Sequence, residues 1–293
     1  MAEVKNKKIL VTGAIGQLGG AAASALLAYG HHIRVMTSDP EKAIDIKELN
    51  VEVFQGDFRD RENMKKALDG LDGAFLMTPS GDGPKAEVTH GKAMIDACKE
   101  KDIGHVVYSS VNSANKKTGV PFFDSKYETE EHLRKSGLSY TILRPVWFME
   151  NFALPWYRPS IEKGVLSTLL RPDRELQMVS VVDIGRIVAE VLTKPMKFVG
   201  REIDIVGDHL TMEKIAEEIS RVLSHPVKYD HIPESRVEKA VGPDWAPMFR
   251  WLNEHGYDAD IYMTHSQFRR FEIPLTSFRE YLEDSRLGIR KAA

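Results

Sequence analysis

The segment Lys8-Ile9-Leu10-Val11-Thr12-Gly13-Ala14-Ile15-Gly16-Gln17-Leu18-Gly19-Gly20 decides the fold. Residues 8–12 are a short apolar run of the kind that forms a buried strand. Glycines follow at a spacing of three, at Gly13, Gly16 and Gly19. Residues 17–29 are small and favour a helix, which Gly30 closes. The segment therefore predicts a strand, a tight turn and a helix in immediate succession.

A glycine turn in this position has a chemical use. Small residues let the backbone approach a pyrophosphate closely, and a helix N-terminus offers unpaired N–H groups and partial positive charge to an anion. The turn therefore predicts a dinucleotide site, with Thr12, Gly13, Ile15, Gly16, Gln17 and Leu18 as the candidate binding residues. The alternative is that the glycines only close a strand–helix turn.

The rest of the first half alternates short apolar strands with longer helices. Strands are expected at residues 8–12, 32–37, 51–54, 73–77, 105–109 and 140–144. Helices are expected at residues 17–29, from 39 onward, and at 60–68, 85–101 and 125–136. Such alternation implies right-handed crossovers, and apolar strands imply helices on both faces. We therefore predict an α/β fold with a doubly wound, mainly parallel Rossmann sheet.

After Pro145 the alternation stops. Two extended segments, 164–170 and 175–180, are separated by a turn, and Asp183 is expected to cap a helix that ends near Leu192. Residues 201–206 have the pattern of a further strand, and Thr211 is expected to cap a second helix. We expect a Rossmann domain at residues 1–152 and a smaller, mostly helical substrate region at 153–293. In that division, the stretch of about 176–206 returns to the Rossmann sheet.

Composition excludes several classes of protein. The 293 residues carry 40 Lys and Arg against 43 Asp and Glu, a formal charge of −3, so no nucleic-acid partner is expected. The single cysteine, Cys98, rules out an intramolecular disulfide and favours a reducing, cytoplasmic location. No apolar run is long enough for a membrane span or a signal-peptide core, and the histidines show no metal-ligand spacing, so neither membrane nor metal is expected.

The end of the second strand should select between NAD and NADP. There Asp39 either favours an unphosphorylated ribose or caps the next helix, whereas Thr37, Ser38 and Lys42 are suited to a phosphate. The preference therefore stays open. Further candidates follow the next two strands: Asp57 and Phe58 near the adenine, and Thr78, Pro79 and Ser80 where the cofactor would cross the sheet.

Several segments together resemble the NmrA-like branch of the atypical short-chain dehydrogenase/reductases. They are the glycine turn, VEVFQGDF (51–58), FFDSKYETEEHLRKSGLSYTILRPVWFMENF (122–152), VVDIGRIVAEVL (181–192) and GDHLTMEKIAEEIS (207–220). The resemblance covers about residues 7–225. It implies an NAD(P)-binding protein, since the family includes quinone, azo and triphenylmethane-dye reductases as well as redox-sensing regulators with little or no catalysis.

The resemblance also implies residue roles. Gly13, Gly16 and Gly19 would form the pyrophosphate turn, and Phe58 with residues 78–80 would flank the adenosine. Lys126 would reach the hydroxyls of the nicotinamide ribose and is the one catalytic candidate. Pro145, Val146, Trp147 and Phe148 belong to segment 145–151, which would form the wall beside the nicotinamide. Many relatives carry a basic residue where Ser38 stands, so the usual preference for NADP is less certain here.

A second departure concerns the proton donor. Classical members use a tyrosine four residues before the lysine, on the same helical face, but this chain has Phe122. Tyr127 is adjacent to Lys126, so on a helix it points about 100° away and is expected to pack instead. The loss removes an obvious route for reducing a simple ketone. Acceptors that delocalise the incoming charge, such as quinones and dyes, need less help.

We therefore expect an NAD(P)H-dependent reductase of quinone-like or conjugated aromatic acceptors. The alternative is a non-catalytic NAD(P)H sensor that acts through a protein partner, and a less favoured option is an isomerase or dehydratase. The aromatic residues Trp147, Phe148, Phe152, Trp156 and Tyr157 either pack in a core or line a substrate pocket. Ser109 and Ser110, at a strand end, either touch a ligand or satisfy local backbone. A homodimer is left open.

Overall fold

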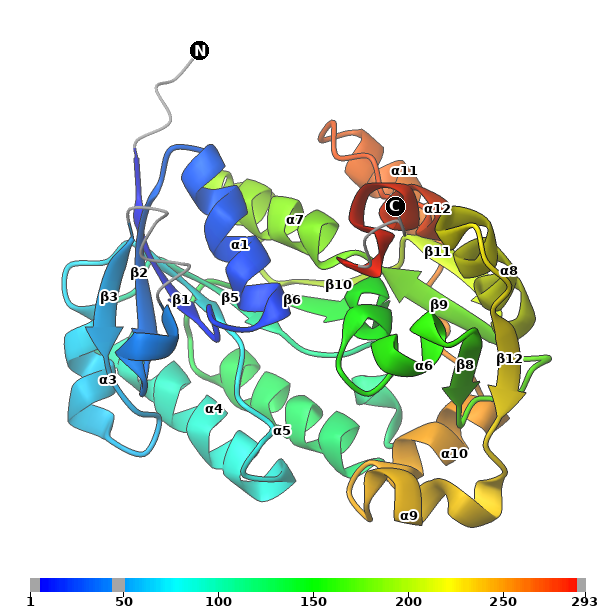
Figure 1. Ribbon diagram of the computed structural model, residues 1–293. Helices are drawn as coiled ribbons and strands as arrows, with labels where there is room; N and C mark the ends of the chain where they lie inside the picture. The colour runs from blue at the N-terminus through cyan, green and yellow to red at the C-terminus, as the bar shows by residue number, and fades with distance from the viewer. Residues whose placement is uncertain (1–5, 44–50, 289–293) are drawn as a thin grey trace.

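Seven parallel strands form the centre of the molecule, and the computed structural model describes them within residues 6–43 and 51–288 (Figure 1). Their order across the sheet is β10-β6-β5-β4-β1-β2-β3. Their bounds are β1 Lys8–Thr12, β2 His32–Thr37, β3 Glu52–Gln55, β4 Gly73–Leu76, β5 His105–Ser109, β6 Tyr140–Pro145 and β10 Arg201–Ile205. Each neighbouring pair is parallel. The order reverses at β1, which confirms the predicted doubly wound Rossmann-like sheet.

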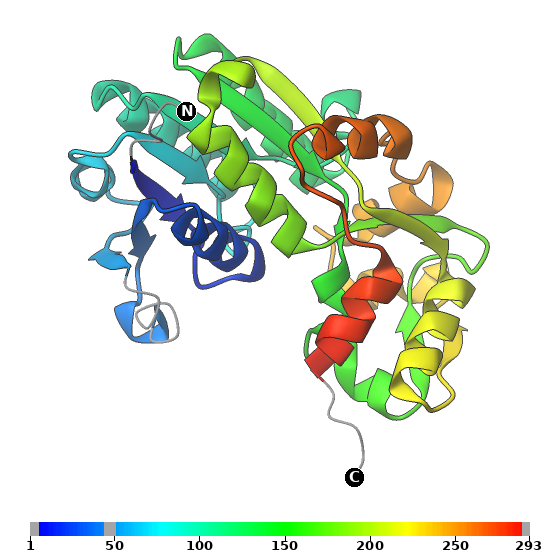
Figure 2. The ribbon, with the colours of Figure 1, turned by 90° about the horizontal axis from the view of Figure 1, so that it is seen from above.

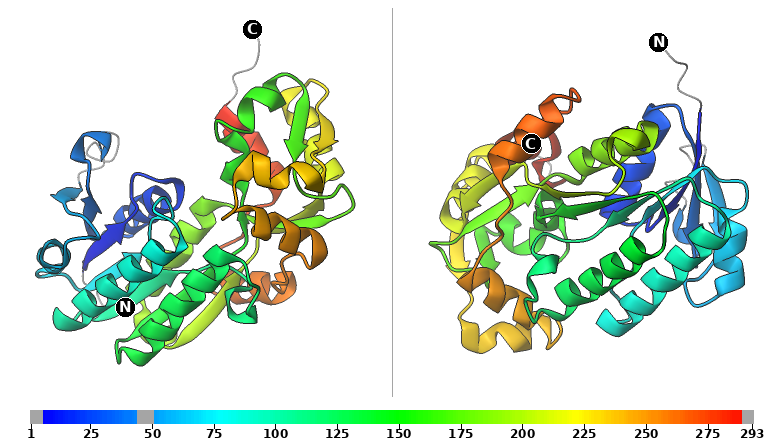
Figure 3. Two further views of the ribbon diagram at one scale, coloured as in Figure 1. Left: turned by 90° about the horizontal axis from the view of Figure 1, so that it is seen from below. Right: turned by 180° about the vertical axis from the view of Figure 1, so that it is seen from behind.

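Helices cover both faces of this sheet. Helices α1 (Gln17–Ala28) and α7 (Val181–Thr193) lie side by side on one face (Figure 2). They approach closely because Gly185 has no side chain, and a Cβ there would lie 2.6 Å from the Ala21 carbonyl oxygen. The opposite face is covered by α3 (Arg61–Leu68), α4 (Pro84–Glu100) and α5 (Pro121–Lys135), with α4 and α5 adjacent (Figure 3).

Each face of the sheet packs into its own hydrophobic core: the first core lies under α1 and α7, and the second under α3, α4 and α5. Side chains along a strand alternate between these two cores, as a sheet covered on both faces requires. In β1, Ile9 and Val11 pack toward α1 and α7, whereas Leu10 packs toward α4. In β5, Val107 faces the first core and Tyr108 the second. Cys98 also lies in the second core, where it is fully buried. The apolar strands of the sequence are therefore apolar because both of their faces are buried.

Two helix starts differ from the prediction. Helix α5 begins at Pro121, four residues before the expected start, because a proline is well tolerated at the first helical position. Helix α7 is capped by Ser180, whose Oγ accepts from the Val182 N–H at 3.2 Å, and not by Asp183. The Asp183 carboxylate instead accepts from the Thr276 N–H at 2.7 Å and holds the C-terminal segment. The helix expected from residue 39 is a 3₁₀ turn at Pro40–Ala43, and its continuation lies outside the described residues.

The second half of the chain contains two small sheets as well as helices. One has the order β11 (Asp208–Thr211), β9 (Glu175–Val179), β7 (Trp147–Phe148), and the other pairs β12 (Lys228–His231) with β8 (Val165–Thr168). The two predicted extended segments thus exist as β8 and β9 but do not pair with each other. The accompanying helices are α6 Arg158–Glu162, α8 Met212–Leu223, α9 Val237–Val241, α10 Ala246–Glu254, α11 Ile261–Arg269 and α12 Phe278–Ser285.

The chain returns to the main sheet through β10, which pairs with β6. Strand β9 does not return with it, because it belongs to the three-stranded sheet. The expected return of residues 176–206 therefore holds for α7 and β10 only, and the division of domains at residue 152 stays a prediction. Among the described helices, none has the length and apolar character that crossing a bilayer requires.

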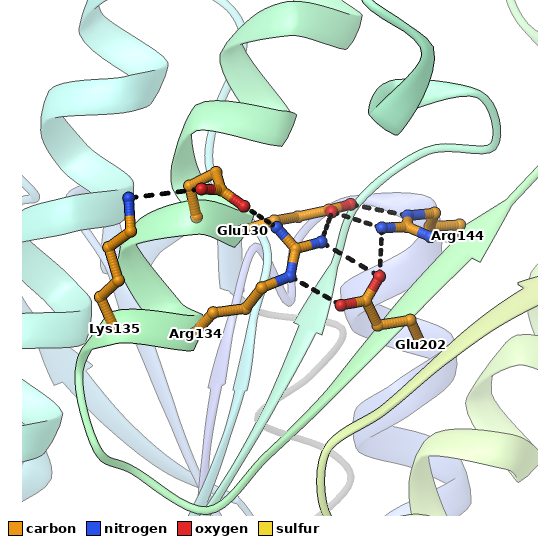
Figure 4. A network of polar contacts seen from close by, with 6 residues as sticks. Glu130, Arg134, Lys135, Arg144 and Glu202 are labelled. Atoms are coloured by element: carbon orange, nitrogen blue, oxygen red, sulfur yellow. Dashed lines mark hydrogen bonds and ion pairs between the residues drawn. The ribbon is translucent and has the colours of Figure 1, made fainter.

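A buried ionic network ties α5 to the edge of the sheet (Figure 4). Arg144 of β6 donates to Glu130 of α5 from Nε at 2.9 Å and to Glu202 of β10 at 2.6 Å. Arg134 donates to both carboxylates as well, at 2.7 Å and 2.6 Å. Since Glu130 is fully buried, it needs these donors. The network fixes where α5, and hence Lys126, lies relative to the carboxyl ends of the strands.

Candidate functional site

The glycine turn has the geometry of an anion site. Gly13 has φ +67°, which favours glycine, and its carbonyl accepts from the Gly16 N–H at 2.9 Å. A Cβ on Gly19 would collide with the Gly13 carbonyl, so the helix can approach the turn only because Gly19 lacks one. Gly16 is the N-cap of α1 and provides no side-chain cap. The first N–H groups of α1 are therefore suited to a pyrophosphate.

The other predicted residues of this turn differ in what their side chains contact. The Thr12 hydroxyl exchanges two hydrogen bonds of 2.8 Å with the Met77 backbone, so it joins β1 to the end of β4. Leu18 is buried in the core, whereas Ile15 is 48% exposed. The Gln17 side chain donates to the Glu150 carbonyl oxygen at 3.1 Å. This last contact connects the glycine turn to segment 145–151.

At the end of β2, the predicted phosphate residue Lys42 is paired with Asp39. Asp39 accepts from the Glu41 N–H at 3.2 Å and so caps the 3₁₀ turn, which is one of the two alternatives for this residue. Lys42 lies 3.2 Å from the Asp39 carboxylate, and both side chains are exposed. Ser38 is exposed beside them. A 2′-phosphate would have to compete with Asp39 for Lys42, so the choice between NAD and NADP stays open.

Asp57 and Phe58 follow β3 at the same edge of the sheet. The Asp57 carboxylate binds Arg59, with 2.6 Å between Oδ2 and the guanidinium, and hydrogen bonds from the Arg59 side chain and backbone lower the pKa of Asp57 to about 2. The half-buried Phe58 ring lies 5.8 Å from the His90 ring, between centroids. Phe58 thus offers an aromatic face near the predicted adenine position, while the Asp57 side chain already has a partner.

Lys126 has a partner that the sequence analysis missed. Its Nζ donates to Oε1 of Glu87 in α4 at 2.8 Å. The same buried carboxylate accepts from Ser125 Oγ at 2.6 Å and from Thr78 Oγ1 at 3.2 Å. Burial lowers the pKa of Lys126, but the Glu87 charge and hydrogen bond, together with Tyr108 and Glu130, raise it, and the net pKa is raised. The signal for Glu87 was its place on the helical face of Gly91, Met94 and Cys98, which is otherwise apolar.

Position 122, four residues before Lys126, is covered by an aromatic stack. The Phe122 ring lies 4.2 Å from the Trp245 ring, at an angle of 27°. Phe122 is buried as a result, and Trp245 keeps 39% exposure. Tyr127 points elsewhere, with the Arg134 guanidinium 5.3 Å from its ring centroid. The structure therefore does not bring Tyr127 into the position of the missing phenol.

Segment 145–151 begins at the end of β6. The Pro145 carbonyl accepts from the Asn112 N–H at 2.9 Å, and the Val146 N–H donates to Ile205 at 3.2 Å. Further along, the Glu150 carboxylate accepts from Ser180 Oγ at 2.8 Å and from the Val181 N–H at 3.0 Å, at the start of α7. Burial raises the pKa of Glu150.

Part of the predicted aromatic group packs in a core. Phe152 packs between Tyr157 and Phe278, with ring centroids 5.7 Å and 5.5 Å away, so these residues are part of a core. Trp156 is 69% exposed. Trp147 packs against Phe249, and its indole N–H is buried with no hydrogen-bond partner among the described residues. Phe148 is half-buried. Ser110 Oγ, at the end of β5, likewise has no partner within the part of the chain that the structure describes.

Comparison with known proteins identifies the family. A model of the NmrA-like family matches residues 5–282. The chain belongs to the NmrA-like family. A family member from Dictyostelium discoideum is 28% identical and covers 95% of this chain and 97% of its own length. Quinone oxidoreductase 2 of Escherichia coli is 26% identical over 78% of each chain.

Solved structures of this NmrA-like fold lie close to the one described here. The triphenylmethane reductase of Citrobacter sp., complexed with NADP(H), superimposes with a TM-score of 0.80. That match covers 95% of this chain and 99% of the reductase at 21% identity. At this level of identity the likeness establishes the Rossmann-like fold.

Proposed function

We propose that this protein binds a reduced nicotinamide dinucleotide and transfers hydride to a quinone-like or conjugated aromatic acceptor. The uncapped N-terminus of α1 and the close glycine turn support the cofactor half of the proposal. Two relatives support the acceptor half, since one is named a quinone oxidoreductase and the other a triphenylmethane reductase complexed with NADP(H).

The observation that carries the acceptor class is Phe122. A phenol four residues before Lys126 would share its helical face and could deliver a proton, but a phenyl ring cannot. Lys126 itself is paired with Glu87 at 2.8 Å, so its charge already has a counterpart. A site with this pair and no phenol favours acceptors whose reduced form needs no enzymatic proton donor.

The residues of the chain then have distinct tasks. Lys126 fixes the nicotinamide ribose, and segment 145–151 forms the wall that fixes the ring. When bound, the reduced nicotinamide supplies one hydride, which carries two electrons. A quinone that accepts the hydride becomes a hydroquinone anion, spreads the charge over its conjugated system, and takes one proton from water. The partly exposed ring of Trp245, which stacks on the buried Phe122, offers a flat face to a planar acceptor beside this position.

The test measures oxidation of NADPH and NADH by absorbance, against a panel of quinones and dyes. We expect turnover in the wild type and its loss in Lys126→Met. Tyr127→Phe is the matched control, because it removes the adjacent hydroxyl from a ring that packs against the Arg134 guanidinium. We expect this variant to keep the wild-type rate.

Two results would overturn the proposal. Loss of turnover in Tyr127→Phe would show that a phenol is the proton donor after all. The second result is a wild type that binds the dinucleotide but oxidises it no faster than Lys126→Met on any acceptor. It would reject the reductase and favour a sensor that acts through a protein partner.

A further inference from the structure

The Glu87 carboxylate is the junction of three segments that flank the proposed cofactor site. Thr78 comes from the loop between β4 and α4, Glu87 from α4, and Ser125 with Lys126 from α5. The side chains of Thr78, Ser125 and Lys126 donate to the two oxygens of Glu87, at 3.2, 2.6 and 2.8 Å respectively. A fully buried carboxylate requires such donors, because an unpaired buried charge is strongly unfavourable.

The arrangement leaves Lys126 able to bind a ligand. Its side chain keeps 18% exposure while Glu87 has none, so the pair is reached by solvent from the lysine end. An ammonium has three N–H donors, and Glu87 takes one of them. The remaining donors are available to ribose hydroxyls, and the contact with Glu87 restricts the rotamers from which they are offered.

We propose that Glu87 is a positioning residue that aims Lys126 at the nicotinamide ribose. The inference rests on the proposed function, in which Lys126 contacts that ribose. Glu87 itself touches no reacting atom. It acts through Lys126, and its effect is confined to the nicotinamide half of the dinucleotide.

Removing the Glu87 charge should also change the pH at which Lys126 loses its proton. The charged and titratable groups around Lys126 are Glu87 from α4, Tyr108 from β5 and Glu130 from its own helix. Burial lowers the pKa of Lys126, and Glu87 is the largest opposing influence. Without the Glu87 charge, the alkaline limit of cofactor binding should therefore move to lower pH.

The experiment compares Glu87→Gln with Glu190→Gln. Glu190 of α7 is a matched control, because like Glu87 it is buried and accepts from a lysine, Lys194, at 2.8 Å. Fluorescence titrations would measure the binding of NADH and NADPH. Calorimetry would measure ADP and its 2′-phosphate form, which lack the nicotinamide ribose. We expect Glu87→Gln to weaken the dinucleotides about ten-fold and the ADP probes less than about two-fold. Glu190→Gln should leave both unchanged.

A cycle with Lys126→Met tests whether Glu87 acts through the lysine. In the Lys126→Met background, Glu87→Gln should add no further loss in dinucleotide binding. This double variant also removes both charges of the pair together, so it stays informative if the single Glu87 variant does not fold. Ser125→Ala, which keeps Glu87 and Lys126, should give a smaller loss in the same direction.

Three results would overturn the inference: equal losses for dinucleotides and ADP probes, an undiminished effect of Glu87→Gln in the Lys126→Met background, or an alkaline limit that does not move. Failure of the proposed function itself would look different, because the wild type would then either bind neither NADH nor NADPH, or bind them without turnover on any acceptor.

Discussion

Acidification should destabilise this fold through His105, the first residue of β5. His105 is buried, and its ring nitrogens contact Ser139 Oγ at 2.8 Å and Thr141 Oγ1 at 2.9 Å. Burial, with a smaller contribution from the charge of Lys7, lowers the pKa of His105 from 6.5 to about 4. The folded state therefore resists a proton that the unfolded chain accepts below pH 6.5.

The direction and size of the effect follow from that difference in pKa. A depressed folded-state pKa contributes stability that is fully present above the unfolded value and is lost as the pH falls toward the folded value. With 6.5 unfolded and about 4 folded, the loss between pH 7.5 and pH 5 is about 2 kcal/mol. For a domain of this size, that is a large part of the free energy of unfolding.

Urea unfolding, followed by circular dichroism at pH 7.5 and pH 5, measures the effect. The comparison is between the wild type and His105→Gln, because all other titrating groups are common to both and cancel in the difference. We expect the free energy of unfolding of the wild type to fall by about 2 kcal/mol more than that of the variant. Equal falls in both proteins would refute the assignment of a neutral, buried His105.

Three further predictions concern the site and its support. In steady-state kinetics, Phe122→Tyr should change quinone turnover far less than the 10²–10⁴-fold that general acid catalysis contributes. A gain of that size would show that the reaction needs a proton donor. Arg144→Met should destabilise the fold by about 3–5 kcal/mol in denaturant unfolding, because Glu130 loses two of its donors. Arg144→Met combined with Glu130→Gln should recover part of that loss, and no recovery would contradict the coupling. Gly19→Ala should abolish dinucleotide binding in titrations, since its Cβ would displace the Gly13 carbonyl, and unaltered affinity would exclude the turn as the binding site.

The fold could be predicted from the sequence because its signals are local. The apolar run before Gly13 and the glycine spacing specify a strand, a turn and a helix within 20 residues, and the same alternation recurs up to Pro145. The pairing of β8 with β12 and of β9 with β11 carries no local signal. Both partners are short, and they are brought together only by the packing of the second half of the chain.

The site was predicted less completely, and for a related reason. Lys126 was found through a local motif, but Glu87 is 39 residues away and becomes its partner only when α4 and α5 pack together. The stack of Trp245 on Phe122 joins residues even further apart in the chain. A buried charge or aromatic pair of this kind depends on tertiary contacts, which a single sequence does not display.

The contact of Glu150 with the start of α7 has a consequence for ligand placement. Helices α1 and α7 lie side by side with their N-termini at the same edge of the sheet, so the chain presents two neighbouring sites of positive potential. At α7, Ser180 and the Glu150 carboxylate occupy that position. At α7 the Glu150 carboxyl group already accepts from the first N–H, whereas at α1 Gly16 provides no side-chain cap. Of these two helix N-termini, we therefore expect that of α1 to receive a phosphate.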